Sequence, residues 1–281
     1  MATVVFTDSG SDVSRDEAVR AGIHLMPMWI IFGTERFRDG LDIDRAKFFS
    51  RIRAGETPQT EPPSAEEWKA AFAPVVEAGD DVVCLTIASQ MSKSYEGAVA
   101  AAKAFGGKVH VVDSCGASSQ ELLLAFYAND LAKSGASAAD VAGKISPRAL
   151  KAATFFAVPN LTQLGKSGRL PKAVVSLGSM LNVSLVLKIN ELGAVAPAGQ
   201  AFSFDKTIEL MVEALVRAIG RADNARVAFS HVESIGTVET ARKAFETKLG
   251  HPAAQEFVRD TSLTLAAHTG IGGIGISAIV P

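Results

Sequence analysis

Short apolar runs alternate with helix-forming segments along the first half of the chain. Ser14 with Glu17, and Ser64 with Glu67, have the spacing of a capping box, which marks a helix start. Buried strands are predicted at 3–7, 81–89 and 108–114, and helices at 94–107, 118–133 and 137–148. Strands that alternate with helices in this way favour a parallel α/β domain, which we place at residues 1–150.

A further apolar run covers residues 23–33 and predicts another buried strand. Pro27 within it indicates an edge strand or an irregularity, because proline has no backbone N–H to donate to a neighbouring strand. Asp44 is placed to cap a helix at 45–55, and the Thr/Pro-rich segment 56–64 that follows predicts a loop.

The pattern changes after about residue 150, and we expect a second domain at 151–281. An amphipathic helix at 204–220 separates a predicted pair of strands from a further strand and helix. The other predicted elements are a strand at 154–160, a helical segment at 161–170, a strand pair within 171–189 and 193–204, a strand at 225–232, a helix at 237–250, and two last strands on either side of 266–275. This order predicts a second α/β domain with a mixed sheet.

Composition excludes several classes of function. The chain has 281 residues, of which 48% are hydrophobic and 21% charged, and its formal net charge is -2, so we expect no nucleic-acid partner. Cys84 and Cys115 belong to no ligand cluster, and we expect no metal site and no cofactor. No apolar run reaches the roughly twenty residues of a membrane span, and the first residues lack a secretory pattern. We therefore expect a cytoplasmic protein without stable membrane insertion.

Four polar segments follow predicted strands: Asp8 to Gly10, the loop around Thr60, Ser89 to Ser94, and Asp113 with Ser114. Ligands of parallel α/β domains gather beyond the carboxyl ends of the strands, so these segments can meet in one crevice. Each also has a simpler explanation, because Asp and Ser after a strand are common helix caps.

Ser92 and Lys93 precede the predicted helix that starts at Ser94. Backbone N–H groups and the positive end of the helix dipole point outward there. A hydroxyl and a cation at this position suit an anion such as a carboxylate or a phosphate, although Ser94 is equally well placed as a helix cap.

Two other segments carry polar groups that could reach a ligand. The glycine-rich stretch 268–275 lacks the Lys-Ser/Thr end of a phosphate-binding loop, so it either forms a tight connection or presents His268 near the domain interface. Lys166 and Arg169 lie in a turn, which either binds an anion or joins two helices. The residues alone leave both alternatives open.

Seven motifs in order along nearly the whole chain resemble the DegV family of bacterial fatty-acid-binding proteins. They are "TDSGSD", "FRDGLDI", "TPQTEPPSAEEW", "IASQMSKSYEGA", "VHVVDSCGAS", "LTQLGKSGRL" and "HTGIGGIG". The resemblance implies a two-domain α/β carrier without catalytic residues. It holds one long-chain fatty acid and presents it to a separate fatty acid kinase, which makes an acyl phosphate.

Carried over by position, the resemblance implies that Thr60, Ser92 and His268 bind the carboxylate at the domain interface. Lys93 and Ser94 are further candidates for the head group. The acyl chain is expected in an apolar tunnel, for which we name Leu164, Leu181, Val183 and Ile276.

The chain departs from the family pattern near the expected head group. Glu61 and Pro62 replace Ser-Gln and add a negative charge, while Lys93 and Ser94 replace Gly-Thr and add a positive one. Lys93 and Glu61 could pair, or Lys93 could neutralise the ligand. Phe202 stands where the family often has an arginine.

Two other functions compete with the carrier. A serine hydrolase would use Ser92 as nucleophile and His268 as base, although no G-x-S-x-G elbow surrounds Ser92. A dihydroxyacetone-kinase-like substrate-binding subunit would have a related architecture but a polar pocket.

Overall fold

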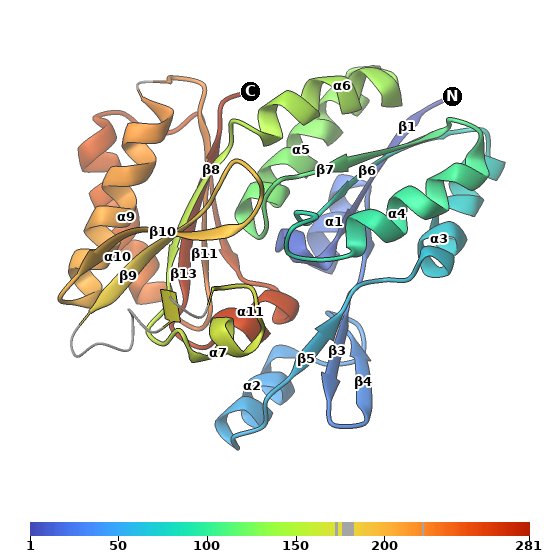
Figure 1. The fold of residues 1–281 in the computed structure, drawn as a ribbon. Helices are drawn as coiled ribbons and strands as arrows, with labels where there is room; N and C mark the ends of the chain where they lie inside the picture. The colour runs from blue at the N-terminus through green and yellow to red at the C-terminus, as the bar shows by residue number, and fades with distance from the viewer. Residues whose placement is uncertain (172–173, 176–182, 221) are drawn as a thin grey trace.

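The computed structural model describes residues 1–171, 174–175, 183–220 and 222–281 (Figure 1). Its first sheet has the strand order β2-β1-β6-β7, and all neighbours in it are parallel. These strands are β1 (Thr3–Asp8), β2 (Ile23–Met26), β6 (Asp81–Thr86) and β7 (Val109–Asp113). The predicted parallel N-terminal sheet is confirmed.

Helices cover both faces of this sheet because successive strand residues point to opposite sides. Phe6 and Cys84 pack under α3 and α4, whereas Val5, Val83 and Leu85 pack under α1, α5 and α6. The helices are α1 (Arg15–Ala21), α3 (Ala65–Glu77), α4 (Ser94–Ala102), α5 (Ser119–Lys133) and α6 (Ala138–Ala149), with short 3-10 turns at η1 (Ser9–Ser11) and η2 (Lys103–Phe105). Both predicted capping boxes are present, at the starts of α1 and α3.

The single strand predicted at 23–33 is wrong. The chain leaves the parallel sheet after β2, passes Pro27, and enters a separate three-stranded antiparallel sheet of order β4-β3-β5. This second sheet consists of β3 (Trp29–Phe32), β4 (Glu35–Arg38) and β5 (Gln59–Glu61), with α2 (Arg45–Arg53) between its last two strands. Thr60, predicted in a loop, therefore lies in a strand, where it is paired with Ile30.

The third sheet is mixed, which confirms the prediction for the C-terminal part. Its order is β10-β9-β8-β13-β11-β12, and among its pairs only β11 with β12 is parallel. The strands are β8 (Ala153–Ala157), β9 (Ser184–Ile189), β10 (Val195–Ala201), β11 (Arg226–His231), β12 (Gln255–Asp260) and β13 (Ile274–Ile279). Helices α9 (Phe204–Ile219) and α10 (Ile235–Leu249) cover one of its faces. The division at residue 150 stays a prediction.

The other face of the mixed sheet is turned toward the parallel sheet (Figure 1). Helix α5 lies between them, since Leu122 to Leu124 pack with Ala228 and Ile279 as well as with the parallel strands. Two short helices complete this side, α7 (Thr162–Lys166) and α11 (Leu263–Thr269). The segment 161–170 is thus helical over fewer residues than predicted. None of the helices in the described ranges combines the length and apolar character needed to cross a membrane.

Helix α11 was not predicted, and it begins at two buried carboxylates from the first half of the chain. Asp12 Oδ1 accepts the Ser262 N–H at 2.8 Å, and Asp39 Oδ2 accepts the Thr264 N–H at 3.0 Å and its hydroxyl at 2.6 Å. Ser118 also donates to Asp12. These donors replace water for the buried charges and tie α11 to the N-terminal elements.

Burial raises the pKa of Asp12 to about 7, although the hydrogen bonds from Ser118 and Ser262 oppose this shift. Burial likewise raises the pKa of Asp39. Removal from water disfavours the charged form of a carboxyl group more than these donors favour it. Ionisation of Asp12 is therefore less favourable in the folded protein than in water.

The turn between β9 and β10 touches the N-terminal loops. Gly193 has φ of +80°, and a Cβ atom added there would lie 2.8 Å from Ala88 Cβ. Next to the turn, Ile189 packs against Met28 and Ile87. Both the backbone conformation and the close approach therefore require glycine at this position.

We expect Gly193→Ala to lower the free energy of unfolding by about 1–3 kcal/mol, because it adds a positive-φ strain and a clash. Urea unfolding measures this. Gly199→Ala is the matched control on β10, since its Cβ would come no closer than 3.8 Å to Val186. Equal effects of the two substitutions would contradict the proposed close contact.

We expect stability to depend on the charge of Asp12 between pH 5 and pH 8. The pKa of Asp12 in the folded protein lies above the ordinary value of 3.8, so the folded chain retains a proton that the unfolded chain has lost. Stability from this group is therefore present at low pH and lost as pH rises through about 7. Between pH 5 and pH 8, wild type should lose about 2–3 kcal/mol more than Asp12→Asn.

Urea unfolding of both proteins at the two pH values measures this difference. Asp16→Asn, at an exposed carboxyl of α1, is the control and should behave as wild type. Parallel pH profiles of wild type and Asp12→Asn would contradict the assignment.

Candidate functional site

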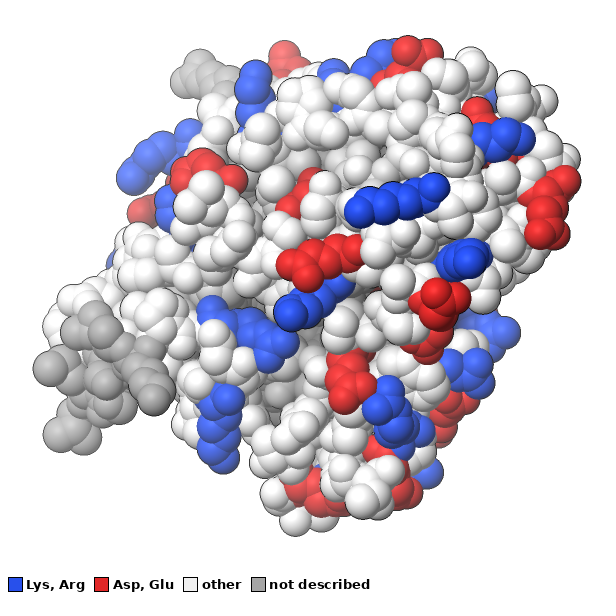
Figure 2. All heavy atoms as spheres, turned by 45° about the vertical axis from the view of Figure 1, so that its right-hand side comes forward, with Lys and Arg blue, Asp and Glu red and all other residues white. Residues whose placement is uncertain are grey.

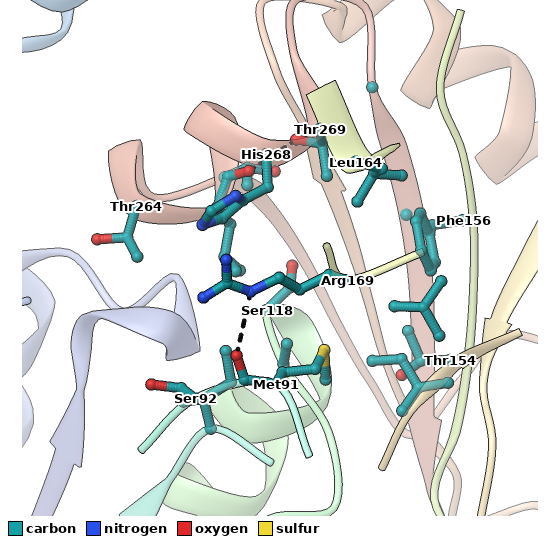
Figure 3. Close-up of a pocket in the computed structure, with 18 of the residues that line it drawn as sticks. Met91, Ser92, Ser118, Thr154, Phe156, Leu164, Arg169, Thr264, His268 and Thr269 are labelled. Atoms are coloured by element: carbon teal, nitrogen blue, oxygen red, sulfur yellow. Dashed lines mark hydrogen bonds between the residues drawn. The ribbon is translucent and has the colours of Figure 1, made fainter. Parts of the chain in front are cut away.

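A cavity of about 510 Å³ lies between the loops that follow β6 and β7 and the inner face of the mixed sheet. Most of its wall is apolar, and Ser92, Thr264 and His268 lie on the side opposite Phe156 and Leu164 (Figure 3). Figure 2 shows a hollow in this view of the molecule with both basic and acidic side chains around it. Its size falls within the usual range of small-ligand sites.

Thr60 and His268 meet at the wall of this cavity. Thr60 Oγ1 lies 2.9 Å from His268 Nε2, although the two residues are far apart in sequence. The antiparallel pairing of β5 with β3 holds Thr60, and α11 holds His268. His268 thus lies on a helix, and the predicted glycine-rich connection begins only after Thr269.

The start of α11 determines where His268 points. Thr264, whose hydroxyl donates to Asp39, lies one turn before His268 on the same helix face. Both side chains line the cavity. Burial and the nearby positive charge of Arg169 lower the pKa of His268 to about 4, so its imidazole is neutral near pH 7.

Ser92 also lines the cavity, in the loop between β6 and α4. The Ser92 N–H donates to Ala88 O at 3.1 Å, and Ser92 Oγ accepts the Ser94 N–H at 3.2 Å. The Ser92 hydroxyl therefore binds the first turn of α4, which fits either a helix cap or part of an anion site.

Ser94, named as a head-group candidate, does not line the cavity. Its side chain is buried and donates to Asp8 Oδ2 at 2.6 Å. Asp8 also accepts the Gly10 N–H at 2.9 Å and the Ile87 N–H at 3.2 Å, and burial raises its pKa to about 6. The Ser94 hydroxyl therefore fixes the loop between β6 and α4 to Asp8 and is not available to a ligand in the cavity.

Arg169 is the basic residue whose role the sequence left open. It lines the cavity, and its guanidinium lies between His268 and Met91 (Figure 3). Its Nε donates to Met91 O at 3.3 Å and its Nη1 to Ser167 O at 2.6 Å. Its place in "LTQLGKSGRL" is the signal that could have identified it.

Lys93 lines the cavity at an exposed position. Glu61, suggested as its partner, makes an ion pair with Arg36 at 2.7 Å. The negative charge added beside Thr60 therefore has a neighbouring cation within the same small sheet. Phe202, the other departure, is 82% exposed.

Only part of the predicted acyl pocket lines the cavity. Leu164 does so, together with Phe156, Ile189 and Val195. Ile276 packs on the opposite face of β13, under α9 and α10, because side chains alternate along a strand. Val183 packs beside the cavity wall without lining it, and Leu181 lies outside the described residues.

The geometry does not pair the proposed nucleophile with a base. In the described part of the chain, the hydroxyl at His268 is that of Thr60, and Ser92 makes no hydrogen bond with the imidazole. Within the same residues, no group of three or more His, Cys, Asp or Glu side chains is placed to hold a metal ion. The arrangement offers hydroxyls, a neutral imidazole, two cations and the carboxylate of Glu96 along a mainly apolar cavity.

Known proteins share similarity with this chain over almost its whole length. The family model described as "Uncharacterised protein, DegV family" matches residues 2–280. A fatty acid-binding protein of Thermotoga maritima is 30% identical over 98% of this chain and 96% of its own length. A DegV domain-containing protein of Deinococcus radiodurans is 28% identical, over 99% of this chain and 98% of its own.

The solved structures agree with the sequence comparison. A DegV family protein from Thermus thermophilus, for which fatty acid binding is described, has a TM-score of 0.92 and 28% identity, and each chain is covered completely. Since the family model matches almost every residue and the fold is shared throughout, this chain belongs to the DegV family.

Proposed function

We propose that the chain binds a long-chain fatty acid in the cavity, with its carboxylate beside Thr60, Ser92 and His268. The proposal rests on one observation. A neutral hydroxyl–imidazole pair and two cations line the wall of a mainly apolar cavity of about 510 Å³. Relatives from Thermotoga maritima and Thermus thermophilus for which fatty acid binding is described support it.

The charges around the head group favour a carboxylate. His268 is neutral, so one ring nitrogen donates and the other accepts. When Nε2 carries the hydrogen, Thr60 Oγ1 accepts it, and the Thr60 hydroxyl can donate to the ligand. Arg169 and Lys93 then supply the positive charge that offsets the carboxylate.

Burial of the acyl chain supplies most of the affinity. Each buried methylene contributes ~0.8 kcal/mol, so roughly fifteen contribute on the order of 12 kcal/mol before the cost of ordering. The head-group contacts are weaker and determine the orientation of the ligand.

Presentation of the acid to a fatty acid kinase is the second part of the proposal, and it rests on the family resemblance. A kinase must reach a carboxylate oxygen, and exposed Lys93 lies on the wall near that end of the cavity. Since such a kinase would draw on the nucleotide pool of the cell, we place the protein in the cytoplasm.

Mass spectrometry of the purified protein, native and after organic extraction, tests the first part. We expect one equivalent of a long-chain fatty acid, because burial of the whole chain should retain it through purification. A protein that is isolated empty and ignores added fatty acids would overturn the proposal. Stabilisation by dihydroxyacetone alone would favour the related kinase subunit, and labelling of Ser92 by a fluorophosphonate would favour a hydrolase.

Charge removal at the cavity wall gives a second prediction. Arg169→Met should weaken binding of stearate roughly 10-fold or more and leave binding of stearyl alcohol nearly unchanged, because only the acid carries a charge. Displacement of a fluorescent fatty acid measures both. Lys166→Met is the control, since Lys166 is a cation three residues away that does not line the cavity.

We expect Lys93→Met to have a smaller effect of the same kind, because Lys93 is exposed and its charge is screened by solvent. Equal losses for the acid and the alcohol in Arg169→Met would show that the residue supports the cavity wall without binding a carboxylate.

A further inference from the structure

The hairpin of β9 and β10 forms part of the cavity wall directly before and after its turn. Ile189 at the end of β9 is paired with Val195 at the start of β10, and both line the cavity. On its other side, Ile189 is paired with Thr154 of β8, which also lines the cavity. Residues paired across antiparallel strands point to the same face of a sheet. The three side chains therefore form one continuous row along the cavity wall.

The turn of this hairpin touches the opposite wall of the cavity. A Cβ atom added at Gly193 would lie 2.8 Å from Ala88 Cβ and 3.4 Å from Cys115 Cα, so the turn contacts the loops that follow β6 and β7. Leu192, the residue before it, is 76% exposed, so solvent lies directly behind the turn. The sheet wall and the loop wall thus meet at the turn, and the cavity ends there.

Hydrogen bonds within the turn hold it in one conformation. Asn190 Oδ1 accepts the N–H groups of Leu192 and Ala194, each at 3.0 Å. The Asn190 backbone donates to Ala194 O at 2.9 Å and accepts the Gly193 N–H at 2.8 Å. An Asn side chain that binds the backbone two residues ahead stabilises a turn. This end of the cavity therefore cannot lengthen unless these bonds break.

The closed end lies opposite the head-group residues. Figure 3 shows Thr154 on one side of the cavity, next to the sheet, and Ser92 and Thr264 on the other. Since the strand register places Ile189 beside Thr154 and Val195 beside Ile189, both aliphatic side chains share the side of Thr154. Apolar surface favours a methyl group over a carboxylate. A ligand whose carboxylate lies near Ser92 therefore directs the methyl end of its chain toward this row.

We propose that Ile189 and Val195 set the longest acyl chain that the protein accepts, because they form a fixed wall against its methyl end. Each methylene that fits inside the cavity strengthens binding roughly 4-fold, which corresponds to ~0.8 kcal/mol. Once the chain reaches the wall, a further methylene forces the ligand or the wall out of its best packing. Affinity therefore has a maximum at one chain length. This inference rests on the proposed function and names the residues that determine its specificity.

The preferred chain length is measured by displacement of a fluorescent fatty acid with saturated acids of every length from lauric to behenic acid. In wild type, we expect the affinity to rise with chain length to one maximum and then to fall. Ile189→Ala and Val195→Ala each leave space that a longer chain can fill, so the maximum should move to acids about two carbons longer. Val195→Leu enlarges the wall and should move the maximum to shorter acids.

Two matched controls lie on the other face of the mixed sheet. Val186 of β9 and Ile276 of β13 pack under α9 and α10, away from the cavity. Val186→Ala and Ile276→Ala remove buried methyl groups, so they should lower stability and leave the preferred chain length unchanged. The comparison of acids within one protein cancels a loss of affinity that is common to all of them. Thermal unfolding identifies any variant that fails to fold, and Val195→Leu tests the wall without creating a cavity.

Three outcomes would overturn the inference. If fatty acids bind and the wall variants prefer the same chain length as wild type, the chain does not end at this row, and the proposed function stands. If the two control variants move the maximum as much as the wall variants do, the row does not determine chain length. If no fatty acid binds at all, the inference and the proposed function fail together.

Discussion

Buried carboxylates must find donors within the protein, and this requirement organises the site. Asp12 and Asp39 accept backbone N–H groups at the start of α11, while Asp8 accepts the hydroxyl of Ser94 at the start of α4. These bonds determine where the two helices begin. His268 lies within α11, and Ser92 lies just before α4. The buried carboxyl groups at the starts of these helices therefore also determine where the two head-group residues lie. The hydrogen bonds that the buried carboxyl groups need and the positions of the head-group residues thus depend on each other.

The parallel sheet could be predicted because its strands are buried on both faces and appear as continuous apolar runs. β6 is such a run, bounded by polar residues at both ends. Hydrophobic pattern does not show when one apolar run contains two strands of different sheets, as at 23–33. Pro27 indicated an irregularity there, but only the packing of β3 against α2 and α11 determines where the second strand goes.

The motifs identify Thr60, Ser92 and His268, and in the structure all three line one cavity. The sequence pattern does not show which other residues line the same cavity. β13 is apolar or small throughout, so nothing in its sequence distinguishes the face of Ile276 from that of Ser277. Antiparallel pairing with β8 and β11 decides the matter. In the same way, Arg169 turns inward because Met91 O is there to accept its Nε, a contact between segments far apart in sequence. Ser94 shows the opposite case, because its hydroxyl lies in a family motif but donates to Asp8 and does not line the cavity.

The small antiparallel sheet is inserted in the connection between β2 and β6, which are both neighbours of β1 in the parallel sheet. The insertion packs on α11 and contributes Thr60 to the cavity wall. In the described residues its strands pair with one another and with no strand of the parallel sheet. A change in the length or charge of this insertion therefore alters the surroundings of Thr60 at the cavity and leaves the order of the parallel strands as it is.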